Sequence, residues 1–321
     1  MHRNLKTYLI LAFGAVLAAC SGNTGTSLPT SNSNNVNPAS NTVNPAAPVT
    51  APSYTMRDPD TGTVAHIMLT TQAAGVTGHG PGVIPAAGSN MVWHGGPVQH
   101  TPHIYIVYWG WKGSDPSGVG PRMQSFFGGV GGSQWLSSQA QYTDSSGHVG
   151  NQTGMLVSTW SDNTNALPRR ITQSALAGEA VRAVSHFSGS YSVSTNYIVA
   201  TPHGHSQSGF GTQWCAYHST ASSGSGTVSW TYMPYMPDAG QNCGANSVNG
   251  GSGGTLDGVT IVGGHEQAET MTDPQLNAWY DNSGAETGDK CAWTNLQNTP
   301  FSTGTFPTQP LWSNSSSSCV Q

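Results

Sequence analysis

Short apolar runs after residue 100 alternate between the spacing of strands and the spacing of helices. Runs rich in β-branched and aromatic residues predict strands at 103–111, 154–160, 196–200 and 228–236. Helical spacing of apolar residues predicts a helix at 171–187, and two short helices at 123–127 and 133–141 separated by the sequence GGVGG. Strands interleaved with helices indicate an α/β or α+β fold with a mixed sheet in a single globular domain.

The N-terminal pattern is that of an export signal. Arg3 and Lys6 precede an apolar run at 8–16 that is too short to span a bilayer stably. The run leads into Leu-Ala-Ala-Cys, which resembles a bacterial lipobox and predicts removal of residues 1–19 and lipidation of Cys20. A plain secretory signal with a chance cysteine is the alternative. We therefore expect an exported protein that is lipid-anchored to a membrane, at the outer membrane or the cell surface.

The segment after Cys20 is of low complexity. Residues 21–55 carry no charge and are dominated by Ser, Asn, Thr, Pro and Ala, so they bury too little apolar surface to offset the entropy of ordering. This composition predicts a tether over 20–85. The remaining residues, 86–321, are numerous enough to bury a substantial core, and we expect them to form the globular domain.

Charge is scarce along the whole chain and excludes several classes of protein. Only 7% of the 321 residues are charged, against about a quarter in ordinary soluble domains, which excludes a coiled coil or a highly charged disordered protein. The net charge is −5, and no basic stripe exists to neutralise a phosphate backbone. We therefore expect no nucleic-acid partner.

Four cysteines remain after Cys20, namely Cys215, Cys243, Cys291 and Cys319. An even number in an exported chain predicts two disulfides. Of the three possible connectivities we favour 215–243 and 291–319, because each closes a loop of about 28 residues within its own segment. A zinc site of four cysteines is the competing interpretation, although no CxxC pair is present.

Acidic residues gather near the C-terminal end of the chain. Six of the fourteen lie within 24 positions, at Glu266, Glu269, Asp273, Asp281, Glu286 and Asp289. Like charges held close together destabilise a fold unless a cation or protons neutralise them. The cluster therefore predicts either a bound cation or a solvated acidic surface patch.

Within this region, residues 265–269 read His-Glu-Gln-Ala-Glu, an HExxE pattern. If 257–272 is a helix with Asp257 as its N-cap, His265 and Glu269 lie four residues apart on one face and can grip one metal ion. The pattern parallels the HExxH helix of zinc peptidases, with Glu266 in the position of the general base. Two glycines, Gly263 and Gly264, predict the close approach of another backbone to this helix.

These residues carry a resemblance to a known family. The string GGHEQAETMTDPQLNAWYD, followed by GAETGDKCAW, resembles the core of the EXORDIUM-like, phosphate-induced protein family of plant extracellular proteins and their bacterial relatives. Similarity extends over about residues 100–321, through HIYIVYWGW, NYIVATP, WCAYHS and the terminal Trp-Ser and Cys. The resemblance implies a divergent metallopeptidase-like fold with His265 and Glu269 as ligands and Glu266 as the base.

A catalytic tetrahedral site needs a third protein ligand. Glu286 and Asp289 lie downstream of Glu269, like the distant carboxylate of some zinc peptidases, and His218 is a further choice. We expect zinc by analogy with the zinc peptidases, but one imidazole with two carboxylates is a harder donor set than zinc usually takes, which leaves manganese or calcium open. A calcium loop at 281–286 is a rival interpretation, although it lacks the full twelve-residue pattern.

Two functions from different classes follow. The first is a membrane-anchored metal-dependent hydrolase, peptidase-like, in which Glu266 activates water at the ion. The second is a non-catalytic surface protein that binds a glycan or peptide through its many Trp and Tyr residues, with a cation that is structural.

Overall fold

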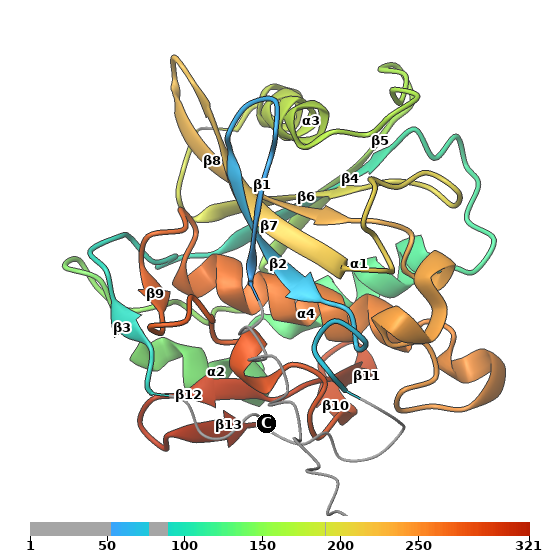
Figure 1. Cartoon of the computed structure of the whole chain (residues 1–321). Coiled ribbons are helices and arrows are strands. Elements are labelled where there is room, and N and C mark those ends of the chain that lie inside the picture. Colours follow the sequence, from blue (N-terminus) through green and yellow to red (C-terminus); the bar gives the residue numbers. More distant parts are fainter. Residues whose placement is uncertain (1–52, 77–88, 190) are drawn as a thin grey trace, which may run out of the picture. The chain divides into compact units, whose positions relative to one another are not determined.

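The computed structural model describes residues 53–76, 89–189 and 191–321, and its centre is a seven-stranded sheet (Figure 1). The strands lie in the order β1-β2-β7-β8-β6-β4-β5. Their bounds are β1 Thr55–Arg57, β2 Val64–Leu69, β4 His103–Trp109, β5 Leu156–Asp162, β6 Thr195–Ala200, β7 Trp214–Ser223 and β8 Gly226–Met233. Strands β8, β6, β4 and β5 are parallel, whereas β1, β2 and β7 pair antiparallel, so the sheet is mixed as predicted.

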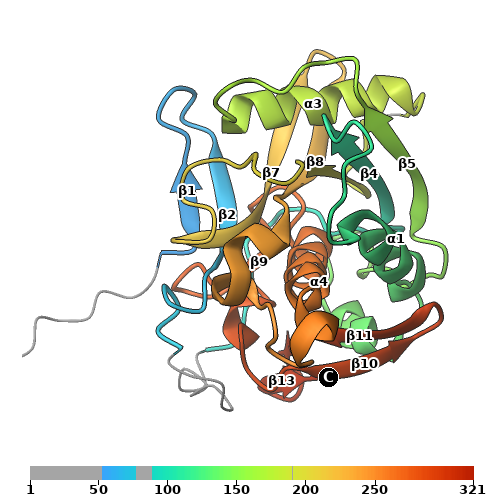
Figure 2. The same cartoon turned by 90° about the vertical axis from the view of Figure 1, so that its right-hand side faces the viewer.

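Helices cover both faces of the sheet. Helix α3 (Gln173–His186) lies on one face, and α1 (Val119–Val130) and α4 (Asp257–Thr272) lie on the other (Figures 1 and 2). Short helices are α2 Gln134–Ser137, η1 Ser138–Gln141, η2 Met236–Cys243, η3 Gly251–Gly254 and η4 Asp289–Cys291. Three small antiparallel pairs complete the fold: β3 Val92–Trp93 with β9 Trp279–Tyr280, β10 Gln297–Phe301 with β11 Gly304–Thr308, and β12 Leu311–Ser313 with β13 Ser318–Val320.

Two hydrophobic cores lie on opposite faces of the sheet, and side chains along a strand point alternately into one and the other. On β4, Ile104 and Ile106 join the core beneath α1 and α4, and Val107 and Trp109 join the core beneath α3. Helix α4 lies between the sheet and the β10–β11 pair, and all sixteen of its residues are buried. A helix buried on every side presents its polar residues to other protein groups rather than to water.

Most of the predicted elements are confirmed. Strands β4, β5, β6 and β8 and helix α3 lie where the pattern placed them, and α4 has the predicted bounds. The sequence GGVGG at 128–132 is predicted to separate two helices. This prediction is wrong for its first three residues, because α1 continues through them to Val130. A Cβ on Gly129 would lie 2.1 Å from Oγ1 of Thr303, so this glycine serves the close approach of the β10–β11 turn.

The predicted tether is wrong for its last part. Strands β1 and β2 lie within 20–85, and β2 is almost wholly buried between β1 and β7. Its sequence VAHIML is a short apolar run whose burial depends on pairing with β7, which local composition does not reveal. The signal peptide, Cys20 and the first part of the tether lie outside the described residues. Among the residues described, no helix is long and apolar enough to cross a membrane.

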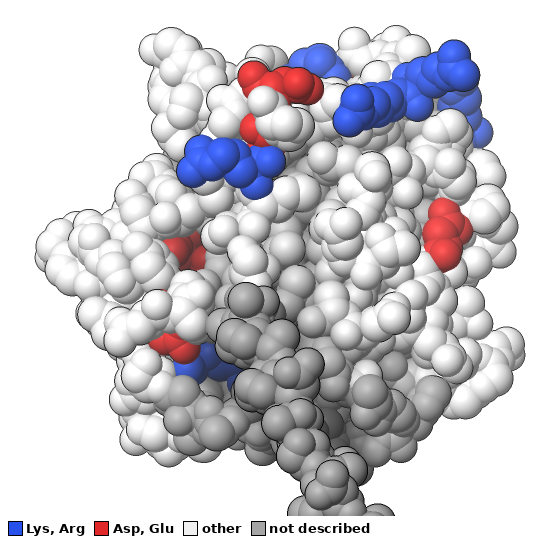
Figure 3. All heavy atoms as spheres, in the orientation of Figure 1, with Lys and Arg blue, Asp and Glu red and all other residues white. Residues whose placement is uncertain are grey.

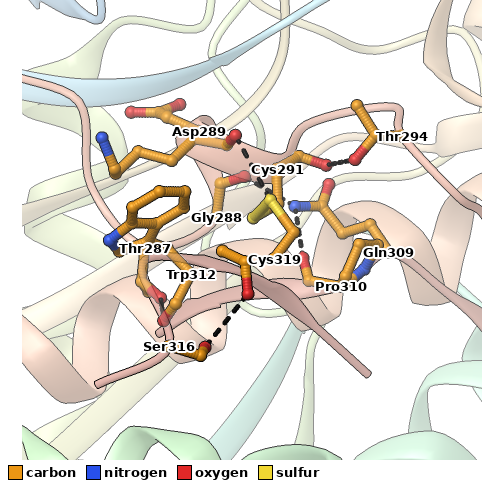
Figure 4. Close-up of a disulfide and its surroundings, with 12 residues drawn as sticks. Thr287, Gly288, Asp289, Cys291, Thr294, Gln309, Pro310, Trp312, Ser316 and Cys319 are labelled. Atoms are coloured by element: carbon orange, nitrogen blue, oxygen red, sulfur yellow. Dashed lines mark hydrogen bonds between the residues drawn. A yellow bond between two sulfur atoms is a disulfide. The ribbon is translucent and has the colours of Figure 1, made fainter. Parts of the chain in front are cut away.

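Both predicted disulfides are present. Cys215 on β7 bonds to Cys243 at the end of η2, and Cys291 of η4 bonds to Cys319 on β13 (Figure 4). The competing four-cysteine zinc site is therefore wrong. Two disulfides are typical of a protein exported to an oxidising compartment.

Two details of α4 differ from expectation. Leu256, not Asp257, is the N-cap, and the Asp257 carboxylate accepts hydrogen bonds from the amides of Val248 (2.8 Å) and Asn249 (2.7 Å). A Cβ on Gly264 would lie 3.0 Å from the ring of Trp135, so aromatic side chains rather than a backbone pack there. A backbone does approach closely at Gly258, where a Cβ would lie 1.8 Å from the carbonyl oxygen of Cys243.

Candidate metal centre

Seven titratable side chains meet between the sheet and α4. They come from β2, β7, α4 and the segment 286–289, and they are His66, His218, His265, Glu266, Glu269, Glu286 and Asp289. None is more than 4% exposed. The alternative of a solvated acidic patch is wrong for the four carboxylates of this cluster, and the face in Figure 3 is largely uncharged. We call these seven residues the histidine–carboxylate cluster.

The two histidines on strands lie directly opposite each other. His66 on β2 pairs with His218 on β7, and their ring centroids are 5.5 Å apart. Met68 and Ala216, two residues from each histidine, belong to the core beneath α4. Because side chains two apart share a face of a sheet, both imidazoles point towards α4.

The segment 286–289 closes the cluster from the other side. Oε1 of Glu269 accepts hydrogen bonds from the amides of Gly288 (3.2 Å) and Asp289 (3.0 Å). A Cβ on Gly288 would lie 2.6 Å from Nδ1 of His265, so only glycine permits this approach without displacement. The disulfide of Cys291 and the Gln309 amide lie around the same turn (Figure 4).

Each imidazole contacts carboxylates or an amide oxygen. His66 lies 2.6 Å from Oδ2 of Asp289 through Nε2 and 3.1 Å from Oε1 of Glu286 through Nδ1. Nδ1 of His218 is 3.2 Å from Oε2 of Glu266, and its Nε2 is 3.6 Å from Oε2 of Glu286.

The third histidine is oriented by a neighbour outside the cluster. Nδ1 of His265 is 3.3 Å from Oε1 of Gln309, whose amide nitrogen donates to the carbonyl of Gly288 (2.7 Å). A proton on Nδ1 leaves Nε2 free as a ligand, the arrangement in which an outer partner fixes a metal-binding histidine. Nε2 lies 3.1 Å from Oε1 of Glu269 and 3.6 Å from Oδ1 of Asp289.

Burial and neighbouring charges raise the pKa of some members of the cluster and lower the pKa of others. Burial raises the pKa of Glu266 and Glu286 well above the ordinary value, and it raises the pKa of Asp289 to about 6. Burial and the neighbouring His66 lower the pKa of His218 to about 3. Although burial acts against it, the nearby His265 lowers the pKa of Glu269 to about 2. Although burial acts against it, the charge of Asp289 raises the pKa of His66 to about 9. Protons therefore offset part of the negative charge of the cluster, and a cation bound there would take their place.

Six atoms of the cluster have no hydrogen-bond partner among the described residues. They are Nε2 of His218 and His265, Oε1 of Glu266, Oε2 of Glu269, Oε2 of Glu286 and Oδ1 of Asp289. Buried polar atoms without partners are costly, and native proteins contain few of them. Imidazole nitrogen with carboxylate oxygen is a donor set that divalent cations accept, so the residues fit such an ion.

Two groups of three have donor atoms close enough to hold one ion. His66, Glu269 and Asp289 form one group, and His218, Glu266 and Glu269 form the other. Within each group the donor atoms lie within 4.8 Å of one another. Glu269 belongs to both.

The structure brings the predicted residues together and adds one. His265, Glu266, Glu269, Glu286 and Asp289 all belong to the cluster, and His218, the further choice, does as well. His66 was missed because it lies in the segment interpreted as tether. The available signal was the apolar run VAHIML with a histidine at its centre.

The remaining acidic residues of the region have other partners. Oδ2 of Asp281 is 2.7 Å from the ammonium of Lys290, and its Oδ1 accepts from the amide of Ser283 (2.8 Å). Asp273 accepts from the amides of Asn277 and Ala278 just after α4 ends. Asp281, on which the calcium-loop interpretation of 281–286 depended, is thus paired with a lysine, and the structure gives that interpretation no support.

Comparison with known proteins supports the resemblance found in the sequence. The chain is 26% identical to Protein EXORDIUM-like 5 of Arabidopsis thaliana over 240 residues, which cover 63% of this chain and 65% of the relative. It thus spans just under two thirds of the length of that protein. No protein-family model matches the chain. No solved structure matches it either.

Proposed function

We propose that this chain is an exported, lipid-anchored member of the EXORDIUM-like family whose histidine–carboxylate cluster binds a divalent cation. The observation that carries the proposal is the set of six buried donor atoms that have no hydrogen-bond partner within the described part of the chain. Burying four ionised carboxylates beside three imidazoles is unfavourable unless a cation or protons compensate their charge. The similarity to an EXORDIUM-like protein supports the family, and the lipobox supports the anchor.

Zinc is the cation we propose first, because the cluster offers three imidazoles together with carboxylates. Manganese also accepts this donor set, whereas calcium prefers oxygen ligands alone. His265 with its Gln309 partner, and Glu269 with its two backbone donors, are held in place before any ion binds. Such preorganisation favours tight binding.

Metal analysis of the full chain tests this proposal. The protein is stripped with a chelator, reloaded with zinc, freed of excess ion and analysed for metal, beside Glu269→Gln and Glu179→Gln. Glu179 is an equally buried carboxylate, but it lies on α3 across the sheet, so its change serves as a matched control. We expect stoichiometric metal in the wild type and Glu179→Gln, and a strong loss in Glu269→Gln. A wild type that retains no metal contradicts the proposal.

Hydrolysis of a peptide-like substrate is the second candidate function, and the position of Glu266 favours it. Its Oε2 lies beside Nδ1 of His218, and its Oε1 has no partner among the described residues, so Oε1 is free to take a proton from water. A bound divalent ion supplies polarisation of a carbonyl and acidifies water. Glu266→Gln is then expected to abolish hydrolysis of a peptide library while metal remains at the group of His66, Glu269 and Asp289, to which Glu266 does not belong.

The burial of the cluster bears directly on this second function. With every member at most 4% exposed, a peptide reaches the ion only if a covering segment moves. Cation binding needs no such movement once the protein has folded around the ion. For this reason cation binding is our first proposal and hydrolysis our second.

A glycan- or peptide-binding role is the alternative, and the β3–β9 pair favours it. Trp93 is 39% exposed, and the rings of His94 and Tyr280 stack with centroids 3.6 Å apart beside it. Exposed aromatic faces are suited to sugar stacking. Binding of soluble glycans that is lost in Trp93→Ala, with metal content unchanged, supports this role; equal binding by both proteins contradicts it.

A further inference from the structure

We infer that the histidine–carboxylate cluster is a dinuclear centre, in which two divalent cations lie side by side and share the Glu269 carboxylate. The inference rests on the proposed cation binding and specifies its stoichiometry. Its starting point is that the two ligand groups, one with His66 and Asp289 and one with His218 and Glu266, overlap only at Glu269.

The two oxygens of Glu269 face different ligand groups, which we call the two halves of the cluster. Oε1 lies 3.1 Å from Nε2 of His265, and Oε2 lies 3.8 Å from Nδ1 of His218. A carboxylate placed between two imidazoles in this way can contact a separate ion through each oxygen. The backbone amides of Gly288 and Asp289 hold Oε1, which fixes the orientation of the whole group.

One further residue lies close to each of the two groups of three. Nε2 of His265 lies 3.6 Å from Oδ1 of Asp289, and both atoms lack hydrogen-bond partners among the residues described. Oε2 of Glu286 likewise lies 3.6 Å from Nε2 of His218, and both of these atoms are also unpartnered. His265 also lies 3.1 Å from Glu269, so it completes the first half as His66, His265, Glu269 and Asp289, four residues as in a structural zinc site. Glu286 lies at Nε2 of His218, whereas Glu266 and Glu269 lie at its Nδ1, so the second half is His218, Glu266 and Glu269, the three protein ligands of a zinc site with one open position.

Charge balance also favours two ions. Four carboxylates carry four negative charges when ionised, and three neutral imidazoles carry none. With all four ionised, one divalent ion leaves two negative charges that protons must compensate in a fully buried site, whereas two divalent ions neutralise the site without protons. A single tetrahedral ion would also leave some of the six unpartnered atoms without a ligand role.

The test is the metal stoichiometry of the full chain after chelation and reloading with zinc alone. We expect two equivalents per chain in the wild type, about one in His66→Gln or His218→Gln, and a loss from both halves in Glu269→Gln. His100→Gln is the control, because His100 pairs with Asp144 outside the cluster, and it is expected to keep two equivalents. One equivalent in the wild type overturns the dinuclear centre but leaves the proposed function standing; none overturns both.

A second measurement guards against variants that fail to fold. The wild type loaded with manganese is expected to show the electron paramagnetic resonance spectrum of two exchange-coupled ions, which isolated ions do not produce. A spectrum of uncoupled manganese at full loading contradicts the shared carboxylate, whatever the variants do.

Discussion

His66 and His218 are cross-strand partners on β2 and β7, and their imidazoles flank the two oxygens of one carboxylate, that of Glu286. Nδ1 of His66 is 3.1 Å from Oε1, and Nε2 of His218 is 3.6 Å from Oε2. Strand register therefore sets the distance between the two halves of the cluster. A shift of β2 by one residue would turn His66 to the opposite face of the sheet.

This dependence on β2 predicts the effect of truncation. A chain of residues 86–321 lacks β1 and β2, so it loses His66 and uncovers the edge of β7. We expect it to aggregate or melt at a lower temperature and to bind less zinc than a chain of residues 50–321. Equal melting temperature and equal metal content for the two chains would show that β2 is dispensable.

Gly288 is predicted to be intolerant of a side chain. In Gly288→Ala the new Cβ meets Nδ1 of His265 at 2.6 Å and Oε1 of Glu269 at 2.9 Å. We expect a loss of about 1–3 kcal/mol in the free energy of unfolding and weaker metal binding. Gly253→Ala is the control, because nothing lies within 4 Å of a Cβ there. Chemical denaturation and zinc titration measure both effects, and similar behaviour of the two variants would refute the packing argument.

The two disulfides are predicted to differ in their effect on the cluster. Both close loops with a sequence separation of 28, so loss of either is expected to cost roughly 2–4 kcal/mol. Cys291 belongs to the three-residue η4, which also contains Asp289, whereas Cys215 lies on a long strand with two neighbours. Replacing Cys291 and Cys319 by Ser should therefore lower zinc affinity more than replacing Cys215 and Cys243. Zinc titration decides, and the reverse order would contradict this reasoning.

Glu179 on α3 predicts a pH dependence unrelated to the metal. Burial, assisted by the charge of Asp162, raises its pKa to about 7 despite the neighbouring Arg182. A carboxyl whose folded pKa is raised costs stability as pH rises from its ordinary pKa through the folded one. Between pH 5 and 8, Glu179→Gln should therefore gain stability relative to wild type. Denaturation at both pH values measures the difference, and a constant difference would exclude the shift.

Anchoring is predicted to depend on Cys20. We expect the wild type to incorporate labelled fatty acid and to partition into the detergent phase, and Cys20→Ser to do neither. The cysteines of the disulfides serve as internal controls, since they are bonded to each other and unavailable for acylation. Membrane association that persists in Cys20→Ser without label would exclude the lipobox interpretation.

Local spacing in the sequence was enough to determine part of the site. The Asp273-Pro274 step marks the end of α4, and the four-residue spacing of His265 and Glu269 places them on one face of that helix. The disulfide pairing followed from loop length. These features depend on residues close to one another in the chain, where periodicity and short-loop entropy act directly.

Tertiary structure decided the rest. His66 and His218 meet because β2 pairs with β7, a contact between segments far apart in sequence that no local pattern encodes. The helical state of Gly129 likewise reflects a distant turn at Thr303 rather than its own low helix propensity. The set of possible ligands is therefore defined only when the sheet, α4 and the segment 286–289 pack together. Packing buries the carboxylates of these segments next to one another, where water no longer screens their charges.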